Sequence, residues 1–114
     1  MKTVTIDVAD RATLNARAHA AFRGEDLGDF ISFESPEALW RTLTPNRWAI
    51  LRTLAGQGPV GVRALARQLG RDVKGVHTDT QALVQCGVLD KADDGKVAFP
   101  YDAVHVDFTI NRAA

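Results

Sequence analysis

The chain has 114 residues, and its 14 acidic and 14 basic side chains leave no net charge. This length is that of one domain, and a hydrophobic content of 46% excludes an intrinsically disordered chain. A single cysteine excludes a disulfide framework, and because no signal-peptide core or bilayer-spanning apolar stretch is present, we expect a cytoplasmic protein without a membrane partner.

Residues 1–34 predict a strand-helix-strand extension. Residues 3–8 alternate between apolar and polar side chains, which is typical of a half-buried strand. Asp10 can cap a helix that ends near Gly24, and residues 30–34 are a short candidate strand. The apolar residues that recur at helical spacing in this helix are Leu14, Ala18, Ala21 and Phe22.

Two further helices are predicted where a hydroxyl residue precedes a proline. Ser35-Pro36 and Thr44-Pro45 each place a capping side chain before a proline at the first helical position. The first of these helices is short. The second continues to the sequence Gly56-Gln57-Gly58-Pro59, which ends it.

Residues 62–70 and 73–86 have the pattern of a helix-turn-helix. Two helices that cross over a short turn need a small residue at their closest approach, which Ala66 supplies. The turn itself needs a residue that tolerates positive φ, which Gly70 supplies. The side chains of the second helix that we expect to face inward are Val73, Val76, Leu83 and Val84.

The second helix departs from this pattern at one point, because Asp79 and Thr80 stand where a large apolar residue is expected. We expect the Thr80 hydroxyl to be semi-buried and to bond back to a backbone carbonyl. Asp72 can cap the start of this helix. The alternative interpretation is a helical hairpin that serves only packing or dimerisation.

A β-hairpin is predicted directly after the second helix. Asp94-Gly95 lies between β-prone runs that begin at Val88 and Val97, and this dipeptide favours a hairpin turn. The predicted fold class is therefore α+β, with a winged helix-turn-helix domain over residues 35–114 and its reading unit at residues 44–100. A last strand follows, in which the apolar residues are Val104, Val106, Phe108 and Ile110.

Basic side chains are concentrated in the middle of the chain. Residues 41–80 carry seven basic side chains and two acidic ones, whereas residues 25–37 carry five acidic side chains and no basic one. Because a nucleic-acid interface depends on local rather than net charge, this distribution favours a DNA-binding function for the winged unit.

The outward face of the second helix is the predicted reader of base edges in double-stranded DNA. Gln81 can pair with adenine, Thr78 can contact a thymine methyl, and Lys74 can reach a guanine or a phosphate. Gly75 would let the helix approach DNA closely, unless it is simply a tolerated surface glycine, and His77 lies at the edge of this face. The residues expected to contact phosphates are Arg47, Arg63 and Arg71 near helix starts and Lys91 and Lys96 beside the hairpin turn.

Several segments resemble a family of predicted prokaryotic transcriptional regulators of the MarR-like winged-helix type. They are Ile31-Ser32-Phe33-Glu34-Ser35, Leu43-Thr44-Pro45, the helix-turn-helix, and Phe99-Pro100-Tyr101-Asp102, and together they span about residues 30–110. The resemblance implies a DNA-binding repressor. Because members are often encoded beside a small toxin, it also implies an antitoxin role with a small toxin protein as partner.

No catalytic, cofactor-binding or metal site is predicted, so we do not expect an enzyme. His19, His77 and His105 are scattered over three elements, and no nucleophile or phosphate-loop motif is present. Cys86 is expected to be a packing residue rather than a redox sensor, because no positive charge lies beside it in the sequence.

Two questions about partners stay open at the level of the sequence. A protein-binding adaptor is the alternative to a DNA-binding regulator, and the aromatic residues Phe22, Phe30 and Trp40 are candidate contacts, although we expect core packing for each. The terminal segments, residues 3–23 and the last strand, either build a homodimer with two reading helices on a palindromic site or complete the sheet of a monomer.

Overall fold

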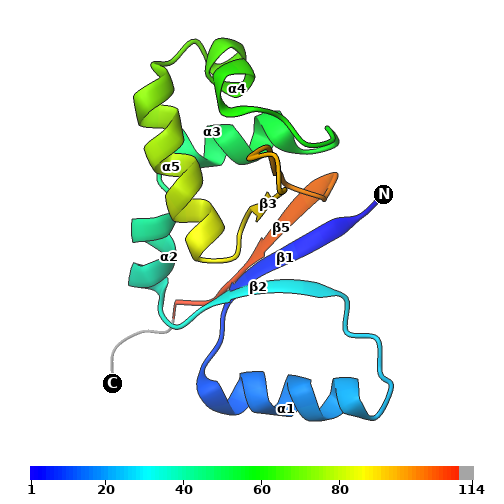
Figure 1. Ribbon diagram of the computed structural model, residues 1–114. Helices are drawn as coiled ribbons and strands as arrows, with labels where there is room; N and C mark the ends of the chain where they lie inside the picture. Colours follow the sequence, from blue (N-terminus) through cyan, green and yellow to red (C-terminus); the bar gives the residue numbers. More distant parts are fainter. Residues whose placement is uncertain (111–114) are drawn as a thin grey trace.

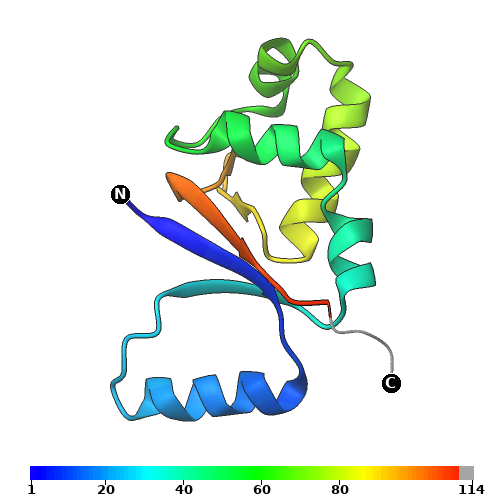
Figure 2. The same ribbon diagram turned by 180° about the vertical axis from the view of Figure 1, so that it is seen from behind.

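A three-stranded parallel sheet lies between helices on both of its faces in the computed structural model, which describes residues 1–110 (Figure 1). The strand order is β2-β1-β5, formed by Asp29–Phe33, Thr3–Val8 and Ala103–Asp107. Helix α1 (Arg11–Phe22) lies on one side of the sheet and the remaining helices on the other, as the views from the front and from behind agree (Figures 1 and 2). The fold class is α+β, as predicted.

The remaining elements follow β2 in chain order. Helices α2 and α3 are Pro36–Thr42 and Pro45–Leu54, and helices α4 and α5 are Val62–Leu69 and Val73–Gln85. A short antiparallel hairpin of β3 (Asp90–Lys91) and β4 (Val97–Ala98) then precedes β5. Among the described residues, no helix has both the length and the apolar character that crossing a bilayer requires.

The helix starts agree with the capping signals in the sequence, with one exception. The side chains of Asp10, Ser35 and Thr44 accept hydrogen bonds from backbone N–H groups three residues later, which satisfies donors that a helix leaves unpaired. Asp72 does hold the first flanking position of α5, but its side chain makes no capping hydrogen bond, so that part of the prediction is wrong.

The turn between α4 and α5 has the predicted geometry. Gly70 has a φ of 65°, in the left-handed region that glycine adopts without a steric cost. The N–H of Arg71 donates to the carbonyl of Ala66 at 3.0 Å, which closes the end of α4. Ala66 is buried in α4, the helix that packs against α5, and the positive φ predicted for Gly70 is confirmed.

One hydrophobic core joins the helices to the sheet. Val4 and Ile6 of β1 are completely buried in it and pack in one cluster with side chains of α3, α4 and α5. The sequence predicts residues 1–34 as an extension, but the side chains of its first strand belong to the same core as the rest of the fold. The largest fully buried side chains of this core outside β1 are Phe99, Leu39, Ile50, Leu51, Leu54, Leu65 and Leu83.

The sequence Phe99-Pro100-Tyr101-Asp102 joins three parts of the fold. Phe99 is completely buried, and the carbonyl of Tyr101 accepts the N–H of Gly56 just after α3. The carboxylate of Asp102 accepts the N–H of Lys2 at 2.8 Å, at the start of β1. Partial burial raises the pKa of the Tyr101 phenol, and the negative charges of Asp29 and Asp90 add to that rise.

The terminal strands pair with each other inside one chain. β1 and β5 are parallel and in register from Thr3 opposite Ala103 to Asp7 opposite Asp107. Within a single chain these strands therefore complete a sheet, and the homodimer stays a prediction. Ile110, predicted to extend the last strand, lies beyond β5 and is exposed.

Several apolar side chains are more exposed than the sequence predicted. In α1 the predicted apolar face is not buried, and Phe22 is 92% exposed. Phe30 and Trp40 are also exposed rather than packed in the core, although Trp40 makes an edge contact with Phe108. Cys86 is exposed as well, so its assignment as a packing residue is wrong.

Candidate nucleic-acid interface

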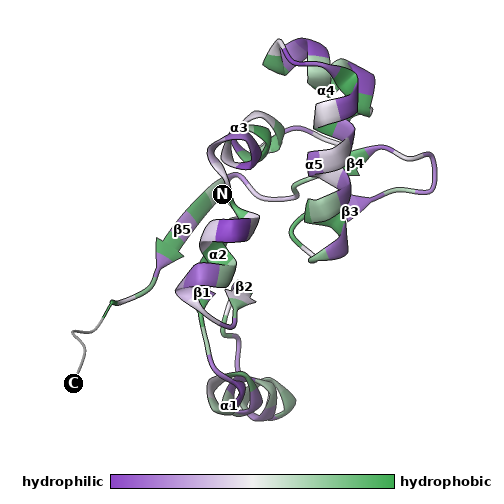
Figure 3. Cartoon of the chain, turned by 90° about the vertical axis from the view of Figure 1, so that its left-hand side faces the viewer, coloured by the Kyte–Doolittle hydropathy of each residue, from purple (hydrophilic) through white to green (hydrophobic). Residues whose placement is uncertain are grey.

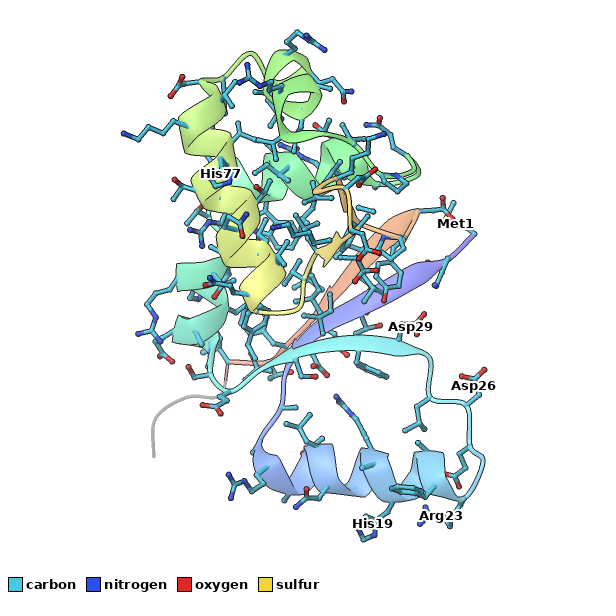
Figure 4. All side chains as sticks on the ribbon, viewed as in Figure 1. Met1, His19, Arg23, Asp26, Asp29 and His77 are labelled. Atoms are coloured by element: carbon cyan, nitrogen blue, oxygen red, sulfur yellow. The ribbon has the colours of Figure 1, made fainter. Side chains whose placement is uncertain are left out.

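Helix α5 has one buried face and one exposed polar face. Val76, Thr80 and Leu83 are buried against the core. The side chains predicted to read DNA lie on the remaining surface, where Lys74, His77 and Thr78 are exposed and Gly75 and Gln81 are half-buried. Figure 4 labels His77 on α5. Val73, at the first position of the helix, is 38% exposed instead of facing inward.

The polar face of α5 is ordered by contacts along the helix. The hydroxyl of Thr78 donates to the carbonyl of Lys74 at 3.1 Å, so its proton is engaged while its oxygen can still accept a hydrogen bond. The amide nitrogen of Gln81 lies 3.4 Å from Nε2 of His77, one helical turn away. The face therefore presents an amide, an imidazole, a hydroxyl and an ammonium group.

Thr80 packs inside the fold as a polar residue with its hydrogen bond satisfied. It is 1% exposed, and its hydroxyl donates to the carbonyl of His77 at 3.0 Å. The back-bonding predicted from the sequence is confirmed, although the side chain is fully rather than partly buried. The second helix thus keeps its packing without the expected large apolar residue.

Arg47 and Arg71 are held by an acidic residue of α5. The Nε of Arg47 lies 3.1 Å from one carboxylate oxygen of Asp79, and the Nη2 of Arg71 lies 2.9 Å from the other. Arg47 also donates from Nη1 to the carbonyl of Thr42. The sequence assigned both arginines to phosphates alone and treated Asp79 only as a break in the apolar pattern, so this cluster was missed. The sequence signal for this cluster was an acidic side chain, Asp79, on the predicted second helix of a unit that also carries two arginines predicted to bind phosphates.

The other predicted phosphate contacts are exposed. Arg63 lies on the solvent side of α4, and Lys91 and Lys96 lie on the hairpin. Lys96 is 3.9 Å from the carboxylate of Asp94, but such an exposed pair contributes little to stability. Apart from this weak pair, none of the three cations forms an ion pair with the residues that the structure describes.

The hairpin is attached to the segment that precedes α4. Val60 and Val97 exchange two backbone hydrogen bonds, of 2.8 and 2.9 Å, so that the hairpin gains a third short extended segment. Figure 3 shows the hairpin projecting beside α5, on the part of the fold that is remote from α1. The predicted DNA contacts therefore fall on the outer face of α5, on Arg71 in the turn before it, on Arg47 of α3 and Arg63 of α4, and on the two lysines of the hairpin.

The family model HVO_A0114 matches residues 42–106, which is more than half of the chain. The chain belongs to the HVO_A0114 family. The part that matches the HVO_A0114 model runs from the end of α2 into β5 and contains α3, α4, α5 and the hairpin. The candidate interface thus lies within the HVO_A0114 region, whereas β1, α1 and β2 lie outside it. A comparison of the sequence with curated proteins finds no match.

Proposed function

We propose that this member of the HVO_A0114 family is a sequence-specific DNA-binding transcriptional regulator. In this proposal α4 and α5 form a helix-turn-helix, α5 enters the major groove, and the β3–β4 hairpin is the wing. The observation that carries the proposal is the exposed polar face of α5, on which Lys74, Thr78 and Gln81 lie opposite its buried apolar residues. A helix of this kind fits the width of the major groove and can present such groups to base edges.

The distribution of charge supports the same function. The acidic side chains of residues 41–80 are limited to Asp72 and Asp79, and Asp79 is engaged by two arginines. The exposed cations of α4, α5 and the hairpin are therefore available for phosphates, which position a protein on DNA without reading its sequence. The hairpin carries Asp93 and Asp94 at its tip, so we expect Lys91 and Lys96 to contact the backbone rather than a groove.

The proposal is tested by measuring DNA binding at several salt concentrations. The wild-type protein is titrated against duplexes that it selects from a random library, with a mixed-sequence duplex as reference. We expect the logarithm of the binding constant for both duplexes to fall linearly with the logarithm of the salt concentration. The slope should be about −0.9 for each phosphate neutralised. Changing Lys74 and Gln81 together to Ala should reduce the preference for the selected site, by about 1–3 kcal/mol for each base pair that the helix no longer reads.

A matched variant controls for general effects of removing a cation and an amide. Arg11 and Asn15 are exposed on α1, on the opposite side of the sheet, and changing both to Ala should leave the sequence preference intact. Salt-independent or undetectable binding would favour the alternative function, a protein-binding adaptor. Salt-dependent binding with an unchanged preference in the α5 variant would remove this helix as the reader.

The partners predicted from the sequence stay predictions. A homodimer would place two copies of α5 about 34 Å apart on a palindromic site, and sedimentation as a monomer at micromolar concentration would contradict it. The repressor activity and the small toxin partner depend on the MarR-like resemblance. Co-expression with the product of a neighbouring gene, followed by co-purification, tests the second of these.

A further inference from the structure

Asp79 connects three segments of the proposed DNA-binding unit through two arginines. Arg47 lies in the first turn of α3, Arg71 in the turn between α4 and α5, and Asp79 on α5 itself. All three side chains are largely shielded, with exposed fractions of 20%, 26% and 16%. Arg47 extends the connection to the end of α2 through its bond to the carbonyl of Thr42. One carboxylate thus bridges these segments.

The cluster keeps an excess of one positive charge. Two guanidinium groups share a single carboxylate, so Asp79 neutralises only half of their charge. A guanidinium carries five N–H donors in a rigid fork, and one bond to a carboxylate fixes the directions of the others. The Nη1 of Arg71 is buried and has no hydrogen-bond partner among the described residues, so it is not the atom that meets DNA. The excess charge of the cluster therefore lies in two arginine side chains that are 20% and 26% exposed.

Gly75 makes room for this cluster. A Cβ atom built at Gly75 would lie 3.2 Å from the Nη2 of Arg71, which is closer than an ordinary van der Waals contact. The Arg71 guanidinium thus passes over the backbone of α5 at the one position that lacks a side chain. This gives Gly75 a role within the protein, beside the close approach to DNA that the sequence predicts for it.

We propose that Asp79 is a positioning residue for DNA binding, which holds Arg47 and Arg71 so that the exposed parts of their cationic side chains face a phosphate of the backbone. This inference rests on the proposed function. It makes a prediction of unusual sign, because removing an acidic group from a DNA-binding surface ordinarily strengthens binding through reduced repulsion. Removing the charge of Asp79 should instead weaken binding, since the arginines lose their fixed orientation.

The experiment compares Asp79→Asn with Asp72→Asn. Asp72 is the other acid of residues 41–80, it is exposed, and its substitution makes the same change in charge. Affinity for a mixed-sequence duplex of about two helical turns is measured by fluorescence anisotropy over a range of salt concentrations. Asp72→Asn should bind about twofold more tightly than wild type. Asp79→Asn should bind about tenfold more weakly, with a salt slope reduced by about 1 for each phosphate that is no longer neutralised.

A second pair of variants keeps the test valid if Asp79→Asn does not fold, as judged by circular dichroism. Arg71→Lys keeps the charge but loses the fork that spans carboxylate and phosphate, whereas Arg63→Lys makes the same change at an exposed arginine. Arg71→Lys should weaken binding several-fold more than Arg63→Lys. If Asp79→Asn folds, the pair Asp79→Asn and Arg71→Lys should show coupled rather than additive losses.

The outcomes separate this inference from the function on which it rests. Wild-type protein that binds the duplex, together with Asp79→Asn that binds as tightly as Asp72→Asn, overturns the positioning role and leaves DNA binding standing. Equal effects of Arg71→Lys and Arg63→Lys overturn it in the same way. Wild-type protein that shows no salt-dependent binding overturns both proposals.

Discussion

Helices α1 and α3 lie on opposite sides of the same sheet, and they are held there in different ways. Helix α3 has three side chains that are at most 1% exposed, Ile50, Leu51 and Leu54. In α1, Ala20 alone is buried. Figure 1 shows the contrast in the arrangement, with α3 packed among helices and α1 alone beneath the sheet. α3 is stabilised by apolar burial, and α1 must be stabilised by something else.

Polar contacts attach α1 to the sheet. The Nη2 of Arg17 lies 2.7 Å from the carboxylate of Asp7, and the same guanidinium bonds the hydroxyl of Ser32 and stacks over the ring of Phe30. Asp7 is buried on β1, where its carboxylate meets Arg17 of α1. The difference between the two helices shows that an ion pair can hold a well-capped helix against a sheet. Such a helix lacks the large buried apolar surface that makes a helix resist local unfolding.

The contrast is tested most strongly by truncating one leucine in each helix. Leu54→Ala should lower the free energy of unfolding by about 2–5 kcal/mol, because it removes a fully buried side chain and leaves a cavity. Leu14→Ala makes the same chemical change at a residue that is 41% exposed, and it should cost less than about 1 kcal/mol. Urea denaturation measures both, and equal losses would contradict the distinction between the helices.

A smaller effect is expected from the ion pair that holds α1. Arg17→Ala should cost about 1–3 kcal/mol, because the carboxylate of Asp7 would remain buried with the Ser32 hydroxyl as its remaining side-chain partner. Arg11→Ala on the same helix removes an exposed arginine and should change stability by less than about 0.5 kcal/mol. If the two variants unfold alike, the ion pair does not hold α1.

The cap of α1 adds a dependence on pH. The hydrogen bond from the Thr13 N–H holds the pKa of Asp10 below its ordinary value of 3.8. The charged carboxylate therefore stabilises the folded state above pH 3.8, and this contribution is lost as the pH falls through the lower folded pKa. Asp10→Ala should destabilise the protein at neutral pH, and the difference from wild type should shrink in acid.

The matched control for this pH effect is the cap of α2. Ser35 accepts the N–H of Ala38 through a hydroxyl that does not titrate, so the loss caused by Ser35→Ala should be the same at neutral and acidic pH. Thermal unfolding followed by circular dichroism at both values measures the two differences. A loss in Asp10→Ala that stays constant down to the acid limit of folding would show that the carboxylate is not the origin of the effect.

The smallest effect is expected at the end of α1. Phe22 is 92% exposed, so Phe22→Ser should change the free energy of unfolding by less than about 0.5 kcal/mol. In hydrogen exchange, the amides of α1 should also open at lower free energy than those of α3. A loss above about 1 kcal/mol in Phe22→Ser, measured by urea denaturation at low protein concentration, would show that this ring packs against the fold.

Features that depend on near neighbours were predictable from the sequence. The caps at Asp10, Ser35 and Thr44 each act on a backbone group three residues away, and the left-handed turn at Gly70 depends on that residue alone. The buried face of α5 around Val76 and Leu83 also followed from spacing, because helical periodicity decides which side chains share a face.

The burial of α1 and the partners of Asp79 were decided by the tertiary structure. The apolar spacing of α1 predicted a buried face, but burial requires an opposing surface, and none covers Phe22 among the described residues. Asp79 meets Arg71 and Arg47 across 8 and 32 residues of sequence, through the crossing of α5 with α3 and the preceding turn. The positions of charges and helices could be predicted from the sequence, but the contacts between them could not. A contact between distant residues exists only once the chain has folded back on itself.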